Sequence, residues 1–378
     1  MDIYETALEL HKKFKGKITT SLRDNEDMSR EKLSAYYSPG VAAVSRAIAD
    51  DPSLLPAYTW TNNLVAVISN GTAVLGLGDI GPKAAMPVME GKSLLFKYFA
   101  NVDSVPIVLN AATADEMVET ITRIAPSFGA INLEDIAAPL CFEIEERLKA
   151  TLDIPVFHDD QHGTAIVTLA GLINAMKVVG KELGNTKIVM VGAGAAGTAI
   201  AKLLNTYASP TIISVDSKGI ISRDRDDLNE EKKLLLGFTN RENISGSLHD
   251  ALKNADIFIG VSKGDLLSAE DIDLMADKPV VFALANPDPE LNPALVAQTK
   301  VAVYATGRSD LPNQVNNAIA FPGIFRGALD HKVKQITEEH KLAAAKAIAA
   351  LIESPTVENV IPSVMDDRLV PTVADVIR

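Results

Sequence analysis

Several features are scarce or missing in this chain of 378 residues, and each gap excludes a class of protein. The single cysteine, Cys141, excludes an internal disulfide framework and a cysteine-rich zinc site, and is expected to be a small buried side chain. Basic residues are outnumbered by acidic ones, and the net charge of −13 argues against a nucleic-acid partner. Polar residues interrupt every apolar stretch before membrane-spanning length, so neither a transmembrane helix nor a membrane partner is expected.

The first residues also lack the features of a secretion signal. The segment MDIYETALELHKKFKGK mixes acids and bases and has neither an apolar core nor a small-residue cleavage site, which predicts a cytoplasmic protein. Short repeats and low-complexity tracts are missing as well. What is present is the balance of a globular protein, with 47% hydrophobic and 22% charged residues, at a length that suits two domains.

The first half alternates short β-branched runs with helical segments, a pattern typical of parallel α/β sheets. The expected strands are LVAVIS (64–69), AVLGLGD (73–79), VPIVLN (105–110), AINLED (130–135) and VFHDD (156–160). Three of them end in acids, namely Asp79, the pair Glu134–Asp135 and the pair Asp159–Asp160. Because ligand sites in open α/β sheets lie outside the carboxyl ends of the strands, these acids are expected to converge there.

The second half begins with a long helical segment after Gly163 and continues as strand, helix, strand. Its expected strands are KIVMVG (187–192), TIISVD (211–216), ADIFIG (255–260), PVVFALAN (279–286) and VAVYATG (301–307). We therefore predict an α/β protein with an N-terminal catalytic domain over residues 1–160. A Rossmann-type dinucleotide-binding domain with a parallel sheet follows over residues 161–378. Its C-terminal helical segment, from about Phe321, is expected to pack against the first domain.

A glycine-rich turn marks the cofactor site. The sequence GAGAAG directly follows a strong strand and opens a helix, which is the context that a dinucleotide-binding fingerprint requires. Its glycines permit a tight turn and a close backbone approach to the pyrophosphate, which the helix N-terminus attracts. The expected cofactor-binding residues of this turn are Gly192, Gly194, Ala195, Ala196 and Gly197.

The next strand ends in Asp216, where an acid can accept hydrogen bonds from the adenosine ribose. The same acid repels a 2′-phosphate, which favours NAD over NADP. Lys218, two residues further on, would weaken that preference.

Four further segments carry candidate catalytic residues: YYSPGVA (36–42), GLGDIGPKAAMPVMEGK (76–92), NLEDIAAP (132–139) and HDDQHGTA (158–165). Each has an ordinary explanation when taken alone, such as a turn tyrosine, a solvated lysine or a helix-capping pair of acids. Their joint order is more informative. With GAGAAG, NPDPELNP (286–293) and QVNNAIAFPG (314–323), they make the chain closely resemble the short bacterial malic enzymes from about residue 10 to Gly323.

The resemblance implies the oxidative decarboxylation of (S)-malate to pyruvate and CO2 with reduction of NAD, through oxaloacetate and enolpyruvate bound to Mg2+ or Mn2+. It also implies a homodimer in which a tyrosine can reach the neighbouring subunit's site. The implied roles are general acid for Tyr37, general base for Lys92, a partner of that lysine for Asp159, metal ligands for Glu134, Asp135 and Asp160, substrate contacts for Asn286 and Asn317, and a cofactor contact for Asn286 as well.

These residue types suit that chemistry. A lysine tuned by desolvation or by a neighbouring cation can accept the hydroxyl proton as hydride leaves C2. Three carboxylates supply hard oxygen ligands for a divalent cation, which stabilises the enolate formed when CO2 departs. A tyrosine hydroxyl can then protonate C3.

One departure from the family pattern and several alternatives stay open. Larger eukaryotic malic enzymes place a carboxylate-binding arginine where this chain has Ala73. An oxaloacetate decarboxylase on the same scaffold would use the metal site without net redox chemistry, and simple malate dehydrogenase would leave the three acids unexplained. A nucleotide sensor would have no need of Tyr37 and Lys92. Zinc bound by His158 and His162 is disfavoured, because zinc prefers a compact set of nitrogen or sulfur ligands.

Overall fold

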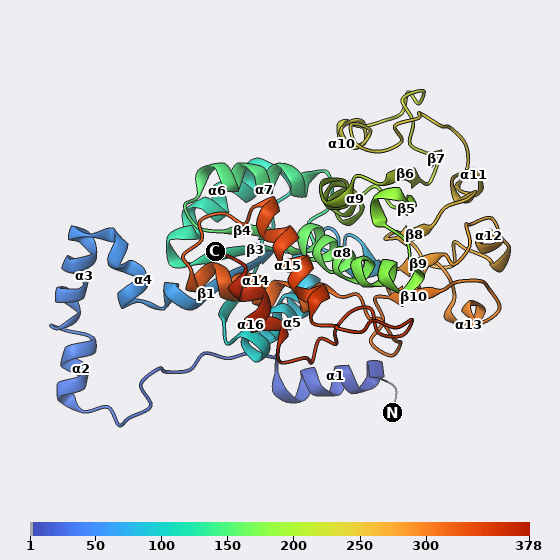
Figure 1. The fold of residues 1–378 in the computed structure, drawn as a ribbon. Coiled ribbons are helices and arrows are strands. Elements are labelled where there is room, and N and C mark those ends of the chain that lie inside the picture. Colours follow the sequence, from blue (N-terminus) through green and yellow to red (C-terminus); the bar gives the residue numbers. More distant parts are fainter. Residues whose placement is uncertain (1–2) are drawn as a thin grey trace.

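The computed structural model describes residues 3–378, which form two sheets with a long helix between them (Figure 1). The first sheet is wholly parallel, in the order β2-β1-β3-β4, and the second has the order β10-β9-β8-β5-β6-β7 with only β7 antiparallel. The strands are β1 (Leu64–Ser69), β2 (Asp103–Val108), β3 (Ala130–Leu133), β4 (Val156–His158), β5 (Lys187–Val191), β6 (Thr211–Asp216), β7 (Gly219–Ile220), β8 (Ile257–Gly260), β9 (Val280–Ala283) and β10 (Val303–Thr306). The expected α/β architecture is confirmed.

The first sheet is covered on both faces, which explains why its central strand is apolar throughout. Val65 and Val67 of β1 face the core that contains α5 (Pro82–Ala100), while Leu64, Ala66 and Ile68 face the opposite core. Successive side chains of a strand point to opposite faces of the sheet, so every side chain of a run such as LVAVIS is buried in one of the two cores. The opposite core is completed by α6 (Ala114–Ile124) and α7 (Leu140–Thr151), and it contains the buried Cys141, as expected.

Helix α8 (Asp159–Val179) connects the two sheets and begins directly where β4 ends. The domain boundary expected after residue 160 therefore falls in the first turn of this helix. Among residues 3–378 it is the one helix whose length and composition would suffice to cross a membrane, but 72% of its most apolar window is buried inside the protein. It contributes to a continuous core that contains residues of both sheets, as expected for a core helix.

The C-terminal helices return to the first domain. They are α14 (Phe321–Asp330), α15 (Glu338–Ala350) and α16 (Leu369–Asp375). The ring of Phe96, on α5, lies 4.8 Å from that of Phe321 and 5.1 Å from that of Phe325, both edge-on. Edge-on aromatic pairs of this kind stabilise beyond their buried area. The expectation that this segment packs against the first domain is confirmed.

The remaining helices of the second domain flank its sheet. Helix α9 (Ala195–Ala208) follows β5 and packs against α8. The others are short: α10 (Glu230–Leu235), α11 (Leu248–Leu252), α12 (Ala269–Asp273) and α13 (Pro293–Val296). Four one-turn 3-10 helices complete the two domains, at Ala125–Ser127, Leu183–Asn185, Asn317–Ile319 and Leu75–Leu77.

Residues 3–59, which we call the N-terminal arm, are far less embedded. The arm contains α1 (Ile3–Phe14), α2 (Arg30–Tyr36), α3 (Val41–Asp50) and α4 (Leu55–Tyr58), with short 3-10 turns at Pro52–Leu54 and, just after it, Trp60–Asn63. None of the four helices contains a buried residue, and α2 and α3 project away from the two sheets (Figure 1).

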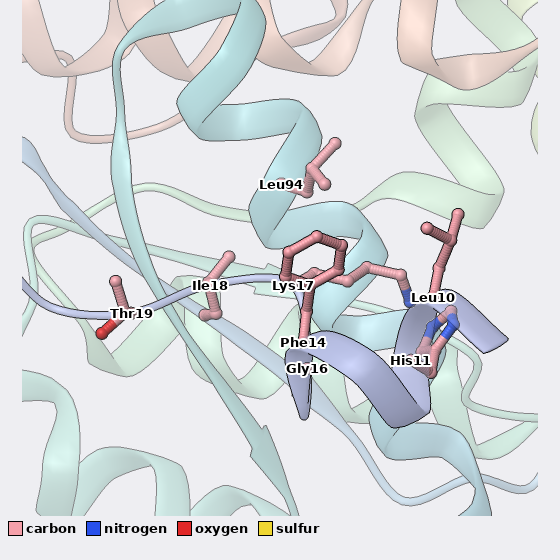
Figure 2. A pocket seen from close by; sticks show the side chains of 8 residues that line it. All are labelled: Leu10, His11, Phe14, Gly16, Lys17, Ile18, Thr19 and Leu94. Carbon is pink, nitrogen blue, oxygen red and sulfur yellow. The ribbon is translucent and has the colours of Figure 1, made fainter. Parts of the chain in front are cut away.

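Helix α1 lies against the body of the protein, beside α5. Between them is a cavity of about 490 Å3 whose apolar wall is made by Leu10, Phe14, Ile18 and Leu94 (Figure 2). Lys17 fixes this end of the arm, because its Nζ donates a hydrogen bond of 2.6 Å to the carbonyl of Pro87 in α5.

One expected strand, AVLGLGD at 73–79, is wrong. This segment forms a 3-10 turn at Leu75–Leu77, closed by a bridge between Val74 and Gly78. Gly71, Gly78 and Gly81 all have φ near +75°, a conformation that L residues rarely adopt and that ends an extended strand. Both edges of β1 are already occupied, by β2 and β3, so the loop instead crosses the carboxyl end of the sheet.

Candidate active site

Lys92 lies at the centre of the site, in the middle of α5. Its Nζ is 2.6 Å from Oδ2 of Asp159 and 3.1 Å from Oε1 of Glu134, and it also lies 4.9 Å from the ring centroid of Phe321. The lysine side chain is 13% exposed and both carboxylates are fully buried. Three elements therefore converge on one ammonium group: α5, the end of β3 and the start of α8.

The protonation of this group follows from its neighbours. Burial alone would lower the pKa of Lys92, but Asp159, Glu134 and Asp160 together outweigh burial and raise that pKa above its ordinary value. Burial in turn raises the pKa of Glu134 and of Asp159, partly offset by the lysine. As the residues stand, Lys92 is a protonated ammonium ion. It becomes a base only when the negative charge around it is reduced.

The other acids gather at the same edge of the first sheet. The backbone amide of Asp135 donates to Oδ2 of Asp160 at 2.7 Å, which joins the end of β3 to the first turn of α8. Asp135 has φ +52°, in the left-handed region, so the chain turns sharply after the strand. Asn132 donates to Oε1 of Glu134 at 2.7 Å. The sequence-based expectation that acids converge here is confirmed for both pairs, whereas Asp79 is exposed in the preceding loop.

These acids have suitable chemistry for a divalent cation, although they are not arranged as a closed ligand set. Within residues 3–378, no three His, Cys, Asp or Glu side chains are placed to hold a metal ion as they stand. Oε2 of Glu134 is nevertheless buried without a hydrogen bond, and Glu134, Asp159 and Asp160 all act on a single lysine. Asp135 is a charged neighbour of Glu134. Hard oxygen donors with excess negative charge fit Mg2+ or Mn2+. A change in side-chain conformation is needed to bring three of them onto one ion.

Glu145 of α7 holds the start of α8 in place, a role that the sequence did not indicate. This buried carboxylate accepts hydrogen bonds from the His158 amide at 3.2 Å and from Nε2 of His162 at 2.8 Å, and it pairs with Lys149 at 2.7 Å. The other ring nitrogen of His162 accepts from Nζ of Lys341, at 3.0 Å, and burial lowers the pKa of His162 to about 4. Since both nitrogens are engaged, this histidine is structural rather than a zinc ligand.

We expect Glu145→Gln to lower the free energy of unfolding by about 1–3 kcal/mol, because amide nitrogen replaces one oxygen that accepts buried hydrogen bonds. Urea titration followed by circular dichroism measures this loss. The matched control is Glu146→Gln at the exposed neighbouring position, which should stay within about 0.5 kcal/mol of the unsubstituted protein. Equal stability of the two variants would contradict the role assigned to Glu145.

The glycine-rich turn has the geometry of a phosphate-binding loop. Gly192 has φ +108°, and a Cβ at Gly197 would lie 1.8 Å from the Gly192 carbonyl oxygen, so neither position tolerates a side chain. Gly194 is the N-cap of α9, and a Cβ there would meet open space. Ala195 and Ala196 then form the first turn, whose amides point out of the helix N-terminus.

The two asparagines assigned to the substrate lie in different surroundings. A Cβ added at Gly163 would lie 3.1 Å from Cβ of Asn317 and 1.9 Å from Oδ1 of Asp159, which places Asn317 beside the lysine cluster. Asn286 follows β9 and is exposed; its carbonyl packs against Gly76 of the first domain. Asn286 therefore lies where the two domains meet. Ala73 does lie at the site, because its amide donates to the Asp135 carbonyl at 3.0 Å.

Tyr37 is not part of this cluster within one chain. It ends α2 on the N-terminal arm, and its side chain is 70% exposed. The structure thus brings together Lys92, Asp159, the metal candidates and Asn317, and leaves the proposed general acid on a projecting arm (Figure 1).

Comparison with known proteins agrees with this architecture. The family model described as the malic enzyme N-terminal domain matches residues 15–149, and that of the malic enzyme NAD binding domain matches residues 161–374. This chain belongs to the malic enzyme family. The first matched segment contains β1, β2 and β3, and the second contains all strands of the second sheet. β4 and the start of α8 lie between the two segments.

Relatives and solved structures extend over almost the whole chain. A bifunctional malic/malolactic enzyme of Bacillus subtilis is 51% identical over 99% of this chain and 92% of its own length. An NADP-dependent malic enzyme of Halomonas elongata is 46% identical over 98% of this chain and 90% of its own length. The crystal structure of an NAD-dependent malic enzyme from Thermotoga maritima matches with a TM-score of 0.95 at 47% identity, covering 98% of both chains. The family thus includes forms that use either cofactor.

Proposed function

We propose that the chain catalyses the oxidative decarboxylation of (S)-malate to pyruvate and CO2, with reduction of a nicotinamide dinucleotide. The observation that carries this proposal is the contact of Lys92 with Asp159 and Glu134 at the carboxyl end of the first sheet, next to a helix that leads into a dinucleotide-binding domain. A purified-protein assay with malate, Mn2+ and either NAD or NADP, following reduced cofactor and CO2 together, tests it. Release of CO2 without reduced cofactor would point instead to an oxaloacetate decarboxylase.

The chain's own residues supply three functions in this reaction. Lys92 exchanges the proton of the substrate hydroxyl, and the buried Asp159 holds its ammonium group in place. Phe321 covers the lysine and limits access of water. Asn317, beside Asp159, is available to hydrogen-bond the substrate. Removal of negative charge from the surrounding carboxylates would lower the pKa of Lys92 and allow it to act as a base.

We further propose Mg2+ or Mn2+ as a cofactor, held by Glu134, Asp135 and Asp160. When bound, such an ion supplies Lewis-acid stabilisation of the negative charge that develops as CO2 leaves. The free buried oxygen of Glu134 and the concentration of carboxylates support this assignment. The net charge of −13 gives it a second role, because a dianionic substrate needs a local positive charge.

Replacing Asp160 by alanine should weaken Mn2+ binding by about 100-fold or more, because one of three proposed ligands is lost. Calorimetric titration of Mn2+ measures the dissociation constant directly. Asp153→Ala is the control, since this acid is 95% exposed and lies seven positions earlier in the chain. Unchanged metal affinity in a folded Asp160→Ala protein would show that the ligand set is misassigned.

For the second cofactor we propose NAD ahead of NADP, because Asp216 ends β6, where an acid can accept hydrogen bonds from an adenosine ribose. We also propose a cytoplasmic location, in keeping with the single cysteine, which is free and buried.

The assembly that we propose is a homodimer closed by the N-terminal arm. A helix with no buried residue and several exposed apolar side chains is unstable alone in water and needs a partner surface. In the arm these exposed side chains are Ile3, Tyr4, Leu8, Leu10, Phe14, Ile18, Leu22, Met28, Leu33, Tyr36, Tyr37, Val41, Val44 and Tyr58. Docking of the arm on a second copy would bury them and carry Tyr37 to the partner's lysine cluster. This arrangement explains how a general acid can lie far from the site in its own chain.

A further inference from the structure

A group of charged side chains closes over the carboxyl end of β6, where the cofactor ribose is expected. We call it the ribose-end cluster; its members are Asp216, Lys218, Arg225, Asp227 and Lys232. Asp216 ends the strand, Lys218 lies in the turn to β7, and the others come from the loop after β7 and from α10. The loop therefore folds back over the one acid that is expected to select the cofactor.

Asp216 has no unused acceptor position in this arrangement. Its Oδ1 accepts from the Lys218 amide at 2.9 Å and from Nη1 of Arg225 at 2.8 Å. Its Oδ2 accepts from Nη2 of Arg225 at 2.9 Å and from Nζ of Lys232 at 2.6 Å. Two carboxylate oxygens offer about four acceptor sites in total, and all are taken. The ribose hydroxyls can reach this carboxylate only by displacing one of these donors.

The five side chains of the ribose-end cluster carry a net positive charge. Its two carboxylates face three cations, so its formal charge is positive although the whole chain carries −13. A cavity of about 680 Å3 at this edge of the second sheet is lined by Asp216, Lys218 and a further lysine, Lys263, as well as by Gly192 of the glycine-rich turn. The acid that would repel a 2′-phosphate is thus outnumbered by cations in its own cavity.

We propose that Arg225 and Lys232 set the cofactor selectivity of this chain by neutralising Asp216, so that the site binds dinucleotides with and without a 2′-phosphate. The inference rests on the proposed function and extends it to the choice of cofactor. Arg225 is the fixed member, because its guanidinium holds Asp216 and Asp227 at the same time. Lys232 is the exchangeable member, because it makes one contact through a flexible side chain.

The side chain of Lys232 then takes a different position with NAD than with NADP. With NAD, a ribose hydroxyl takes the place of Lys232 at Oδ2 of Asp216. With NADP, Lys232 and the largely exposed Lys218 turn to the 2′-phosphate, and Arg225 keeps Asp216 neutralised. An unpaired aspartate at this position would instead reject the phosphate.

The first test measures binding to the protein as it is, without malate. Adenosine 2′,5′-bisphosphate and adenosine 5′-monophosphate are titrated by calorimetry, followed by NADP and NAD. We expect the dissociation constants within each pair to agree within about tenfold, because attraction by the lysines offsets repulsion by Asp216. Discrimination of about 1,000-fold or more against the 2′-phosphate would overturn the proposal. Since no turnover is involved, this result is independent of whether malate is the substrate.

The second test compares two adjacent lysines. Lys232→Met removes the exchangeable cation and should weaken NADP binding by at least about tenfold while leaving NAD binding within about threefold. Lys233→Met is the matched control, because Lys233 is 57% exposed and pairs with Glu230 in its own helix; it should change neither affinity. If Lys232→Met and Lys233→Met have the same ratio of NADP to NAD affinity, Lys232 does not set the selectivity and the proposal fails.

Discussion

Replacing Lys92 by alanine should lower kcat for malate oxidation by about 10²- to 10⁴-fold, the range that positioned proton transfer contributes. Lys92 is the one cation in contact with both Asp159 and Glu134, and no other basic side chain among residues 3–378 forms an ion pair with either acid. Binding of NAD should remain within about twofold, because the glycine-rich turn lies on a different sheet. Stopped-flow absorbance of the reduced cofactor and calorimetric NAD titration measure the two quantities separately.

The same substitution has a structural consequence that needs its own control. Removing one partner of a buried ion pair leaves uncompensated carboxylates and costs about 3–5 kcal/mol unless they take up protons. Melting temperature and near-UV circular dichroism must therefore accompany the rate measurement. Lys97→Ala, on the same helix but half-exposed, removes a surface pair with Asp103 and should leave kcat unchanged.

A proton-transfer role can be separated from a merely structural one by chemical rescue. A small primary amine in the buffer should restore part of the activity of Lys92→Ala, with a rate that rises with amine concentration. Near-normal turnover of the unrescued variant would remove Lys92 from the mechanism. A folded, NAD-binding variant that no amine restores would leave Lys92 as a partner of the carboxylates alone.

Much of this site could be predicted from the sequence because its signals are local. The run LVAVIS predicts a strand buried on both faces, and acids that end parallel strands must meet at one edge of a sheet. The contact between Lys92 and Asp159 spans 67 residues, and the order of motifs indicated that these two residues belong to one site. The strand predicted at 73–79 failed because its apolar composition gave no indication of the backbone reversals at its glycines.

Tertiary partners of the functional residues could not be predicted in the same way. Asp216 was interpreted as a free acceptor, yet Arg225 and Lys232 reach it from nine and sixteen residues further along the chain. Glu145 of α7 contacts His162 of α8, seventeen residues further along the chain, and no sequence pattern indicates this pairing. Such contacts depend on how a loop or helix packs against the rest of the fold, and the spacing of motifs in the sequence does not encode this packing. These contacts also determine which charges surround a functional residue such as Asp216.

Two inactive variants should restore each other's activity if Tyr37 acts in the partner subunit. Tyr37→Phe lacks the proposed general acid, and Lys92→Ala lacks the proposed base. When both variants are unfolded together and refolded at equal concentration, random pairing makes about half of the dimers mixed. In each mixed dimer one site combines an intact Lys92 with Tyr37 of the other subunit, so about a quarter of wild-type activity should appear.

The experiment distinguishes a tyrosine supplied by the partner subunit from one supplied by the same chain. If Tyr37 served the lysine of its own chain, every site in a mixed dimer would lack one of the two groups and no activity would return. Substituting Tyr58 by phenylalanine in place of Tyr37 is the control, because it lies exposed on the same arm and should leave activity intact without any mixing. Sedimentation at each step confirms that dimers form. Tyr37 is 70% exposed in a single chain, and a role in the partner subunit's active site would explain this exposure.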